Sequence, residues 1–191
     1  MTPLPKTLPD VKRFITTHND NGAAIFSTAV SDIVPRTPVP GAYFSLAYAT
    51  NSLPTSLQND DDLSIYDNYL KENPGLTIST GSVCRVVDIG PGVTSAMHRT
   101  VSLDYGVVLE GEVELILDSG EIRRMQKGDI AIQRGTCHAW KNVTVSTAAD
   151  GREEPGWARM LYVLLPIDPV VIDGGGELGE SVPGMGVQPS T

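Results

Sequence analysis

Two stretches of the chain decide its fold. They read GVTSAMHRTVSLDYGVVLEG over residues 92–111 and GDIAIQRGTCHAWKN over residues 128–142. In an extended strand, side-chain direction repeats every two residues, so His98 and Thr100 share one face. Asp104 follows after a short connection and can point back into the same space from the next strand. The first stretch therefore predicts a cluster of polar side chains on neighbouring strands.

The second stretch contributes His138 from a later part of the chain. In a strand, His138, Trp140 and Asn142 alternate with their neighbours and point to one face. Together the two stretches predict one small-molecule pocket on a β scaffold. Its predicted polar centre is His98, Thr100, Asp104 and His138.

Short strands and turns account for the chain around these stretches. Glycine and proline are frequent, at 19 and 14 residues, and turn signals recur between short alternating segments. Asp118-Ser119-Gly120 is one such turn. This spacing predicts an all-β fold, an antiparallel barrel or sandwich. The expected strands lie at residues 82–89, 105–109, 113–117, 121–125, 130–132, 137–140 and 157–165.

The 191 residues are expected to form a single domain. Its motif-bearing core spans about residues 82–166. Short apolar runs within residues 12–49 predict an arm with edge strands. Residues 63–70 are expected to form one or two helical turns, ended by Asn73-Pro74-Gly75. The tail, residues 170–191, is expected either to wrap the barrel or to be loosely ordered.

Composition limits the partners and the compartment. The net charge is −9 with no basic stripe, which argues against nucleic acid. No segment approaches the about 20 consecutive apolar residues that span a membrane, so no membrane partner is expected. The first residues lack the charged-then-apolar order of a secretory signal, and we expect a cytoplasmic protein. The only two cysteines, Cys84 and Cys137, are too few for a disulfide framework. No nucleotide or organic cofactor is indicated.

The first stretch resembles the first signature motif of the cupin superfamily. That motif runs from a glycine through His-x-His and a glutamate to a second glycine. Here Gly92, His98, Thr100, Asp104 and Gly111 stand at the matching positions. Threonine replaces the second histidine, and aspartate replaces the glutamate.

The second stretch resembles the second cupin motif. Gly128, Gly135, His138 and Asn142 fit it, whereas Gln133 stands near the usual proline, one residue early. The resemblance covers about residues 82–142. It implies a cupin (double-stranded β-helix, or jelly-roll) barrel with N-terminal arm strands, and it implies a homodimer.

The resemblance also bears on metal binding. In metal-binding cupins, the histidines and glutamate of the first motif join the second-motif histidine around one divalent ion. Carried over, this implies His98, Asp104 and His138 as ligands for zinc or iron, with Thr100 unable to supply an imidazole. The alternative is that the two histidines are neutral, hydrogen-bonded pocket residues.

A narrower resemblance concerns function. The strings HRTVSLDY over residues 98–105 and QRGTCHAW over residues 133–140 are similar to small fungal and bacterial cupins among natural-product tailoring enzymes. Some of those are assigned as decarboxylases or dehydratases of polyketide-like acids. The resemblance therefore implies a lyase that decarboxylates or dehydrates a polyketide-like or aromatic acid in secondary metabolism.

Each pocket residue has an expected role in such chemistry. His98 or His138 would act as acid or base, since histidine suits proton transfer at neutral pH. Asp104 would orient one imidazole or act as the base itself. Thr100 completes the expected catalytic set.

Substrate binding is assigned to residues outside this centre. Arg85 or Arg134 would bind a substrate carboxylate, and Trp140 would supply a flat apolar wall. The alternatives are a surface role for Arg134, an ion pair near Asp88 for Arg85 and simple core packing for Trp140.

Other functions use the same pocket. A metal-dependent dioxygenase would ordinarily need the ligand set that Thr100 interrupts. A cupin isomerase or cyclase would need only shape and one acid. A non-catalytic small-molecule-binding cupin would keep the barrel without the polar centre.

Overall fold

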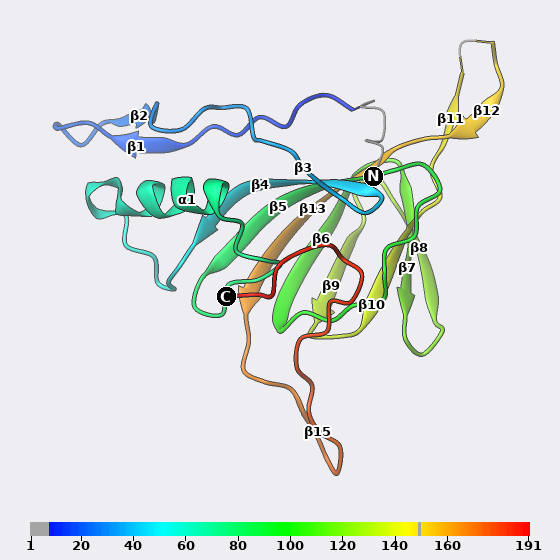
Figure 1. The fold of residues 1–191 in the computed structure, drawn as a ribbon. Coiled ribbons are helices and arrows are strands. Elements are labelled where there is room, and N and C mark those ends of the chain that lie inside the picture. Colours follow the sequence, from blue (N-terminus) through cyan, green and yellow to red (C-terminus); the bar gives the residue numbers. More distant parts are fainter. Residues whose placement is uncertain (1–7, 149) are drawn as a thin grey trace.

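The computed structural model describes residues 8–148 and 150–191. Two antiparallel sheets dominate it (Figure 1). The larger sheet has the strand order β3-β4-β5-β13-β6-β9, and the smaller one has the order β10-β7-β8. These strands are β3 (Thr37–Val39), β4 (Ala42–Thr50), β5 (Ser82–Ile89), β6 (Ser102–Glu110), β7 (Glu112–Leu117), β8 (Ile122–Gln126), β9 (Ile130–Arg134), β10 (His138–Asn142) and β13 (Ala158–Pro166).

The remaining elements lie outside these two sheets. In the part of the chain that the structure describes, they are three two-stranded ribbons and two helices (Figure 1). The ribbons are β1 (Thr16–His18) with β2 (Ala24–Phe26), β11 (Val145–Thr147) with β12 (Glu153–Pro155), and β14 (Val171–Ile172) with β15 (Gly176–Glu177), and the helices are the 3-10 helix η1 (Gln58–Asp60) and α1 (Asp61–Lys71). Helix α1 lies beside β4 (Figure 1). No helix within the described ranges is both long and apolar enough to cross a bilayer.

The two sheets share one apolar core, as the predicted all-β cupin architecture requires. Val108 and Met160 from the larger sheet pack in the same cluster as Val113 and Met125 from the smaller one. Val113 and Met160 are fully buried, and each such side chain contributes about 1.5–3 kcal/mol by leaving water. The core therefore joins the sheets along much of their length and leaves a cavity where polar residues replace apolar ones.

Helix α1 is longer than the one or two turns predicted. Asp61 and Asp62 stand in its first turn and Lys71 in its last, which suits the helix dipole at both ends. Tyr66 is fully buried, and its hydroxyl donates to the carbonyl oxygen of Leu46 on β4 at 2.7 Å. Tertiary packing against β4 thus stabilises a helix that its polar sequence indicates only weakly.

Gly111 and Asn142, which end the two motifs, have structural roles. Gly111 has a φ of +78°, and a Cβ there would lie 2.3 Å from Oγ1 of Thr144. The buried Asn142 amide donates to the carbonyl oxygens of Ile89, Gly90 and Gly156 at 2.8–2.9 Å. Asn142 thereby ties β10 to the end of β5 and to the turn before β13.

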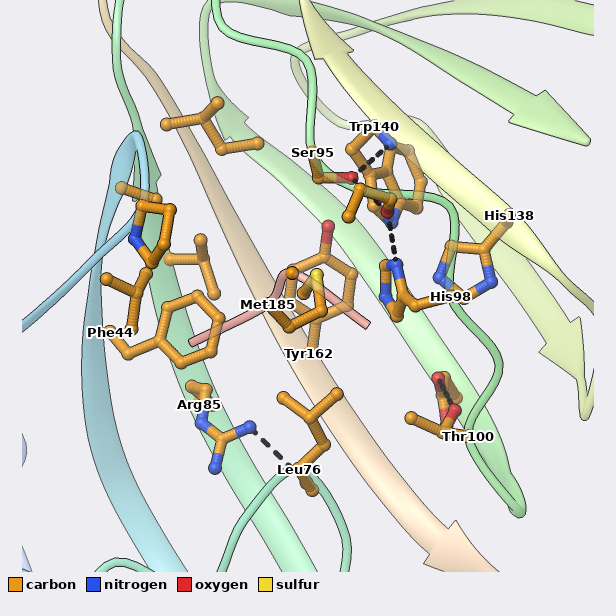
Figure 2. A pocket seen from close by; sticks show the side chains of 18 of the residues that line it. Phe44, Leu76, Arg85, Ser95, His98, Thr100, His138, Trp140, Tyr162 and Met185 are labelled. Carbon is orange, nitrogen blue, oxygen red and sulfur yellow. Dashed lines mark hydrogen bonds between the residues drawn. The ribbon is translucent and has the colours of Figure 1, made fainter. Parts of the chain in front are cut away.

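The tail wraps the sheets, which was one of the two predicted alternatives. Ser181 pairs with Arg99 through two backbone hydrogen bonds of 2.7 and 2.9 Å. Further along, the amide of Thr77 donates to Oγ of Ser190 at 3.0 Å. Between these two attachments the chain passes over the cavity and places Met185 against it (Figures 1 and 2).

Candidate functional site

A cavity of about 200 Å³ lies between the two sheets and is covered by the tail. Because side chains alternate along a strand, Arg85 points into the cavity from β5 and Trp140 points into it from β10 (Figure 2). Asp104 on β6 also lines the cavity. Its walls are mostly apolar and carry several polar groups. The apolar walls include Val39, Phe44, Ile89, Val93, Trp140 and Met185, and the polar residues include Arg85, Thr94, Ser95, His98, Thr100, Asp104, Gln133 and His138.

The two histidines are held side by side by the main chain. The segment before β6 runs beside β10, and His98 and His138 exchange two backbone hydrogen bonds of 2.9 Å. Their ring centroids lie 4.3 Å apart at an angle of 57°. The predicted meeting of the two motifs therefore occurs, and it brings the imidazoles together at the cavity wall (Figure 2).

Backbone carbonyls fix the tautomer of both imidazoles. Nδ1 of His98 lies 2.9 Å from the carbonyl oxygen of Ala96, and Nδ1 of His138 lies 2.9 Å from that of Thr136. A carbonyl oxygen only accepts, so each Nδ1 carries the proton and each Nε2 keeps its lone pair. Carbonyl groups, and not Asp104, orient the imidazoles.

Burial keeps both histidines uncharged. It lowers the pKa of His98, and burial together with the neighbouring His98 lowers the pKa of His138 to about 4. At neutral pH the site therefore holds two unprotonated Nε2 atoms.

Asp104 forms a separate polar group with two hydroxyls. Ser102 donates to its Oδ1, and Thr100 donates to its Oδ2 at 3.2 Å. Burial raises the pKa of Asp104 to about 6, although both hydrogen bonds act in the opposite direction. Thr100 thus positions the carboxyl group, and Asp104 can exist as an acid or as a carboxylate near neutral pH.

The expected metal ligands are not gathered into a metal site. Within residues 8–148 and 150–191, no group of three histidine, cysteine or acidic side chains is placed to hold an ion. His98 and His138 are adjacent, but the oxygens of Asp104 are engaged by Ser102 and Thr100. Aspartate is one methylene shorter than the glutamate of metal-binding cupins, so its carboxylate stays with these hydroxyls. The residues present do not fit the three-ligand set that the resemblance implied.

Arg85 is a buried cation in the wall of the cavity. It is 2% exposed, donates to the carbonyl oxygen of Leu76 at 3.3 Å, and lies 5.1 Å from the centre of the Phe44 ring. Burial lowers its pKa to about 10, so it remains charged at neutral pH. A terminal guanidinium nitrogen also donates to the carbonyl oxygen of Gly75. Among the described residues no carboxylate lies within ion-pair distance of Arg85, although Asp104 interacts with it electrostatically, and its Nε has no hydrogen-bond partner.

The alternative ion pair of Arg85 near Asp88 is not formed. Asp88 points away from the cavity and binds Arg159, at 2.8 Å between Oδ2 and a terminal guanidinium nitrogen. It also binds Arg36 of the N-terminal arm at 3.1 Å. Asp88 therefore fastens the arm, and Arg85 is left to the cavity.

Arg134, predicted as an alternative to Arg85 for binding a substrate carboxylate, lies outside the cavity. It is exposed at the end of β9. Ile130 and Ile132 are 61% and 53% exposed, so the inward positions of this strand are Ala131 and Gln133. Judged by hydrophobicity alone, the two isoleucines would be expected to face inward, but in the strand they face outward.

Trp140 faces the cavity as predicted. Its indole packs edge-on against Tyr162, with ring centroids 5.8 Å apart. A Cβ on Gly106 would lie 3.1 Å from the Tyr162 ring, so glycine at this position lets the two aromatic rings approach. Trp140 therefore forms a flat apolar wall at the site (Figure 2).

Sequence reasoning assigned no role to three residues that line the cavity. Gln133 is named only for its place in the second motif, yet it is 3% exposed and points inward. Tyr162 is one of many apolar residues in the last strand. Met185 lies in a tail without periodicity. Gln133 shares the inward face of Ala131, but the isoleucines beside it suggest the opposite alternation, so the sequence carries no usable signal for any of the three.

The two motifs meeting at a cavity between antiparallel sheets define a cupin-type protein. No protein-family model matches the chain. Curated relatives do: phomopsin biosynthesis cluster protein C' of Diaporthe leptostromiformis is 44% identical over 176 residues, covering 92% of this chain and 87% of the relative. Oryzines biosynthesis cluster protein J of Aspergillus oryzae is 43% identical over 93% of this chain and 94% of its own length.

A further relative carries the fold in its name. The cupin-domain-containing oxidoreductase virC of Hypocrea virens is 44% identical over 84% of this chain and 78% of the relative. The chain therefore belongs to this family of cupin-domain-containing proteins, whose members include proteins of fungal biosynthesis clusters. Among solved structures, the cupin domain of Schizosaccharomyces pombe Cnp3 matches 84% of this chain and 90% of its own, with a TM-score of 0.48 and 15% identity.

Proposed function

We propose that the protein is a small-molecule lyase that removes carbon dioxide or water from a largely apolar organic acid. One observation supports this most strongly: a buried arginine that forms no ion pair with any described carboxylate shares a mostly apolar cavity with two neutral imidazoles. A buried charge is costly unless it is paired, so Arg85 favours an anionic ligand. A carboxylate bound by the guanidinium supplies that charge in a well-defined geometry.

The proton-transfer groups stand around the same cavity. In dehydration, Nε2 of His98 or His138 takes the proton next to the carboxylate, and the protonated form of Asp104 gives a proton to the departing hydroxyl. The C–O bond breaks, a C=C bond forms, and water leaves. In decarboxylation, the C–C bond to the carboxylate breaks, carbon dioxide leaves, and Asp104 protonates the carbon left behind. Either route needs only groups that line the cavity.

The names of the relatives support a substrate from secondary metabolism and also suggest a second candidate. Four relatives, virC, fogC, srdD and srdB, are named oxidoreductases. The same cavity could hold an acid that is oxidised by an external electron acceptor. Oxygen consumption or reduction of an added acceptor would accompany turnover in that case, and neither accompanies a lyase reaction.

The test follows product formation from aromatic β-hydroxy and β-oxo acids by mass spectrometry. Arg85→Gln and Arg134→Gln form a matched pair, because the first removes the buried cation and the second removes an exposed one. Wild type and Arg134→Gln are expected to release water or carbon dioxide from the substrate at equal rates. Arg85→Gln is expected to lose about 100-fold in kcat/KM, the cost of one charged hydrogen-bonded contact. Equal rates in all three proteins would contradict the proposal.

A further inference from the structure

Gln133 is a buried amide without a partner. It is 3% exposed, it lines the cavity, and neither its Nε2 nor its Oε1 has a hydrogen-bond partner among the described residues. Buried amides in folded proteins are almost always paired. A buried amide without a partner among the described protein groups is suited to forming hydrogen bonds with a ligand.

The neighbours of Gln133 indicate which part of a ligand it meets. Gln133 on β9 stands directly opposite Asp104 on β6 in the strand register. Side chains opposite each other in an antiparallel pair share a face and lie close together. Gln133 therefore flanks the carboxyl group that donates a proton in the proposed reaction.

We propose that Gln133 binds the hydroxyl group of a β-hydroxy acid whose carboxylate is bound by Arg85. This inference rests on the proposed lyase function and names its substrate class. A hydroxyl accepts from Nε2 and donates to an oxygen, whereas a ketone or ether only accepts. The amide thus holds the hydroxyl oxygen beside Asp104.

This arrangement favours dehydration over decarboxylation. A carboxylate that leaves as carbon dioxide would give up its contact with Arg85 as the reaction proceeds, so binding would stabilise the substrate more than the transition state. A leaving hydroxyl keeps that contact intact. The base takes the proton on the carbon between the two groups, Asp104 protonates the hydroxyl, and the products are an α,β-unsaturated acid and water.

Binding measurements with three probes test the assignment. They are β-hydroxy-β-phenylpropionate, its β-methoxy ether and unsubstituted β-phenylpropionate, titrated calorimetrically into wild type, Gln133→Leu and Gln126→Leu. Gln126 is an exposed glutamine on β8 and serves as the matched control. We expect wild type and Gln126→Leu to bind the hydroxy acid about tenfold more tightly than either other probe, and Gln133→Leu to bind all three within about twofold.

Thermal unfolding without ligand separates ligand binding from a structural role. Leucine has nearly the volume of glutamine and leaves no unpaired polar atoms, so Gln133→Leu is expected to raise Tm. A structural glutamine would instead give a lower Tm. A lower Tm, or a hydroxyl preference that survives in Gln133→Leu, would overturn the assignment.

Turnover distinguishes this inference from the lyase proposal. The hydroxyl preference could depend on Gln133 while no acid tested forms the unsaturated acid or loses carbon dioxide. That result would support the role of Gln133 in binding and contradict the proposed lyase activity. Formation of the unsaturated acid at equal rates in wild type and Gln133→Leu would support the lyase activity and contradict the role of Gln133 in binding.

Discussion

Asp104 and His138 are expected to affect the stability of the fold in opposite ways as pH changes. The pKa of Asp104 is raised from 3.8 to about 6, so between these values the native state keeps a proton that the unfolded chain has lost. Its contribution to the free energy of unfolding therefore falls as pH rises. The pKa of His138 is lowered from 6.5 to about 4, so in nearly the same window the unfolded chain holds the extra proton. Its contribution rises with pH.

The two contributions are similar in size. Each pKa unit corresponds to about 1.4 kcal/mol, so shifts of two units or slightly more give about 3 kcal/mol in each direction. In wild type they largely cancel. Asp104→Asn removes the falling contribution, and the free energy of unfolding should then rise by about 3 kcal/mol relative to wild type from about pH 4 to about pH 7. His138→Gln should give a relative fall of about 3 kcal/mol over that range.

Urea unfolding at a series of pH values measures these differences. The fluorescence of the buried Trp140 and Trp157 reports unfolding. The comparison uses the slopes against pH, because each substitution also changes stability by an amount independent of pH. Curves for both variants that run parallel to wild type from about pH 4 to about pH 7 would refute the opposed contributions of Asp104 and His138.

Three further predictions concern other parts of the molecule. Asn142→Leu leaves three buried carbonyl groups without their donor and should lower the free energy of unfolding by about 3 kcal/mol in urea titrations; a loss below about 1 kcal/mol would contradict the tie between β10 and β5. Met185→Ala opens the tail side of the cavity and should weaken binding of β-phenylpropionate about tenfold in calorimetry, with Kd unchanged if the tail does not cover the ligand. We propose that the homodimer implied by the resemblance pairs through the exposed isoleucines Ile130 and Ile132 on β9, and Ile132→Glu should then halve the mass seen by light scattering; a wild-type monomer would contradict the homodimer.

Much of the fold was predictable because strands and turns carry local signals. The alternation in residues 113–117 and the turn at residues 118–120 correspond to β7 and its connection to β8. The hairpin of β11 and β12 was not predicted, since each of its strands has only three residues and all six are exposed. Helix α1 was underestimated because its stability comes from contacts with β4 that are distant in sequence.

The candidate site was predictable where the motifs fix both spacing and face. His98, Thr100, Asp104, His138 and Trp140 all line the cavity. The pairing of Asp104 with hydroxyls depends on side-chain reach, which the motif does not specify.

The substrate-binding side of the cavity was less predictable. Arg85 and Arg134 both lie on strands, and only Arg85 faces inward. Strand β9 carries its isoleucines on the outer face, so hydrophobicity alone indicates the wrong side of the strand for Gln133.

Exchange of the substrate α-proton with solvent tests the central claim most directly, namely that His98 and His138 form a proton-transfer pair beside an acid held by Arg85. β-Hydroxy-β-phenylpropionate is incubated with the protein in deuterium oxide, and deuterium on the carbon next to the carboxylate is followed by NMR. The account predicts deuterium incorporation with wild type and Arg134→Gln, and a loss of at least about 100-fold in rate with the His98→Gln/His138→Gln double variant. Undiminished exchange in the double variant, or no exchange with wild type, would contradict it.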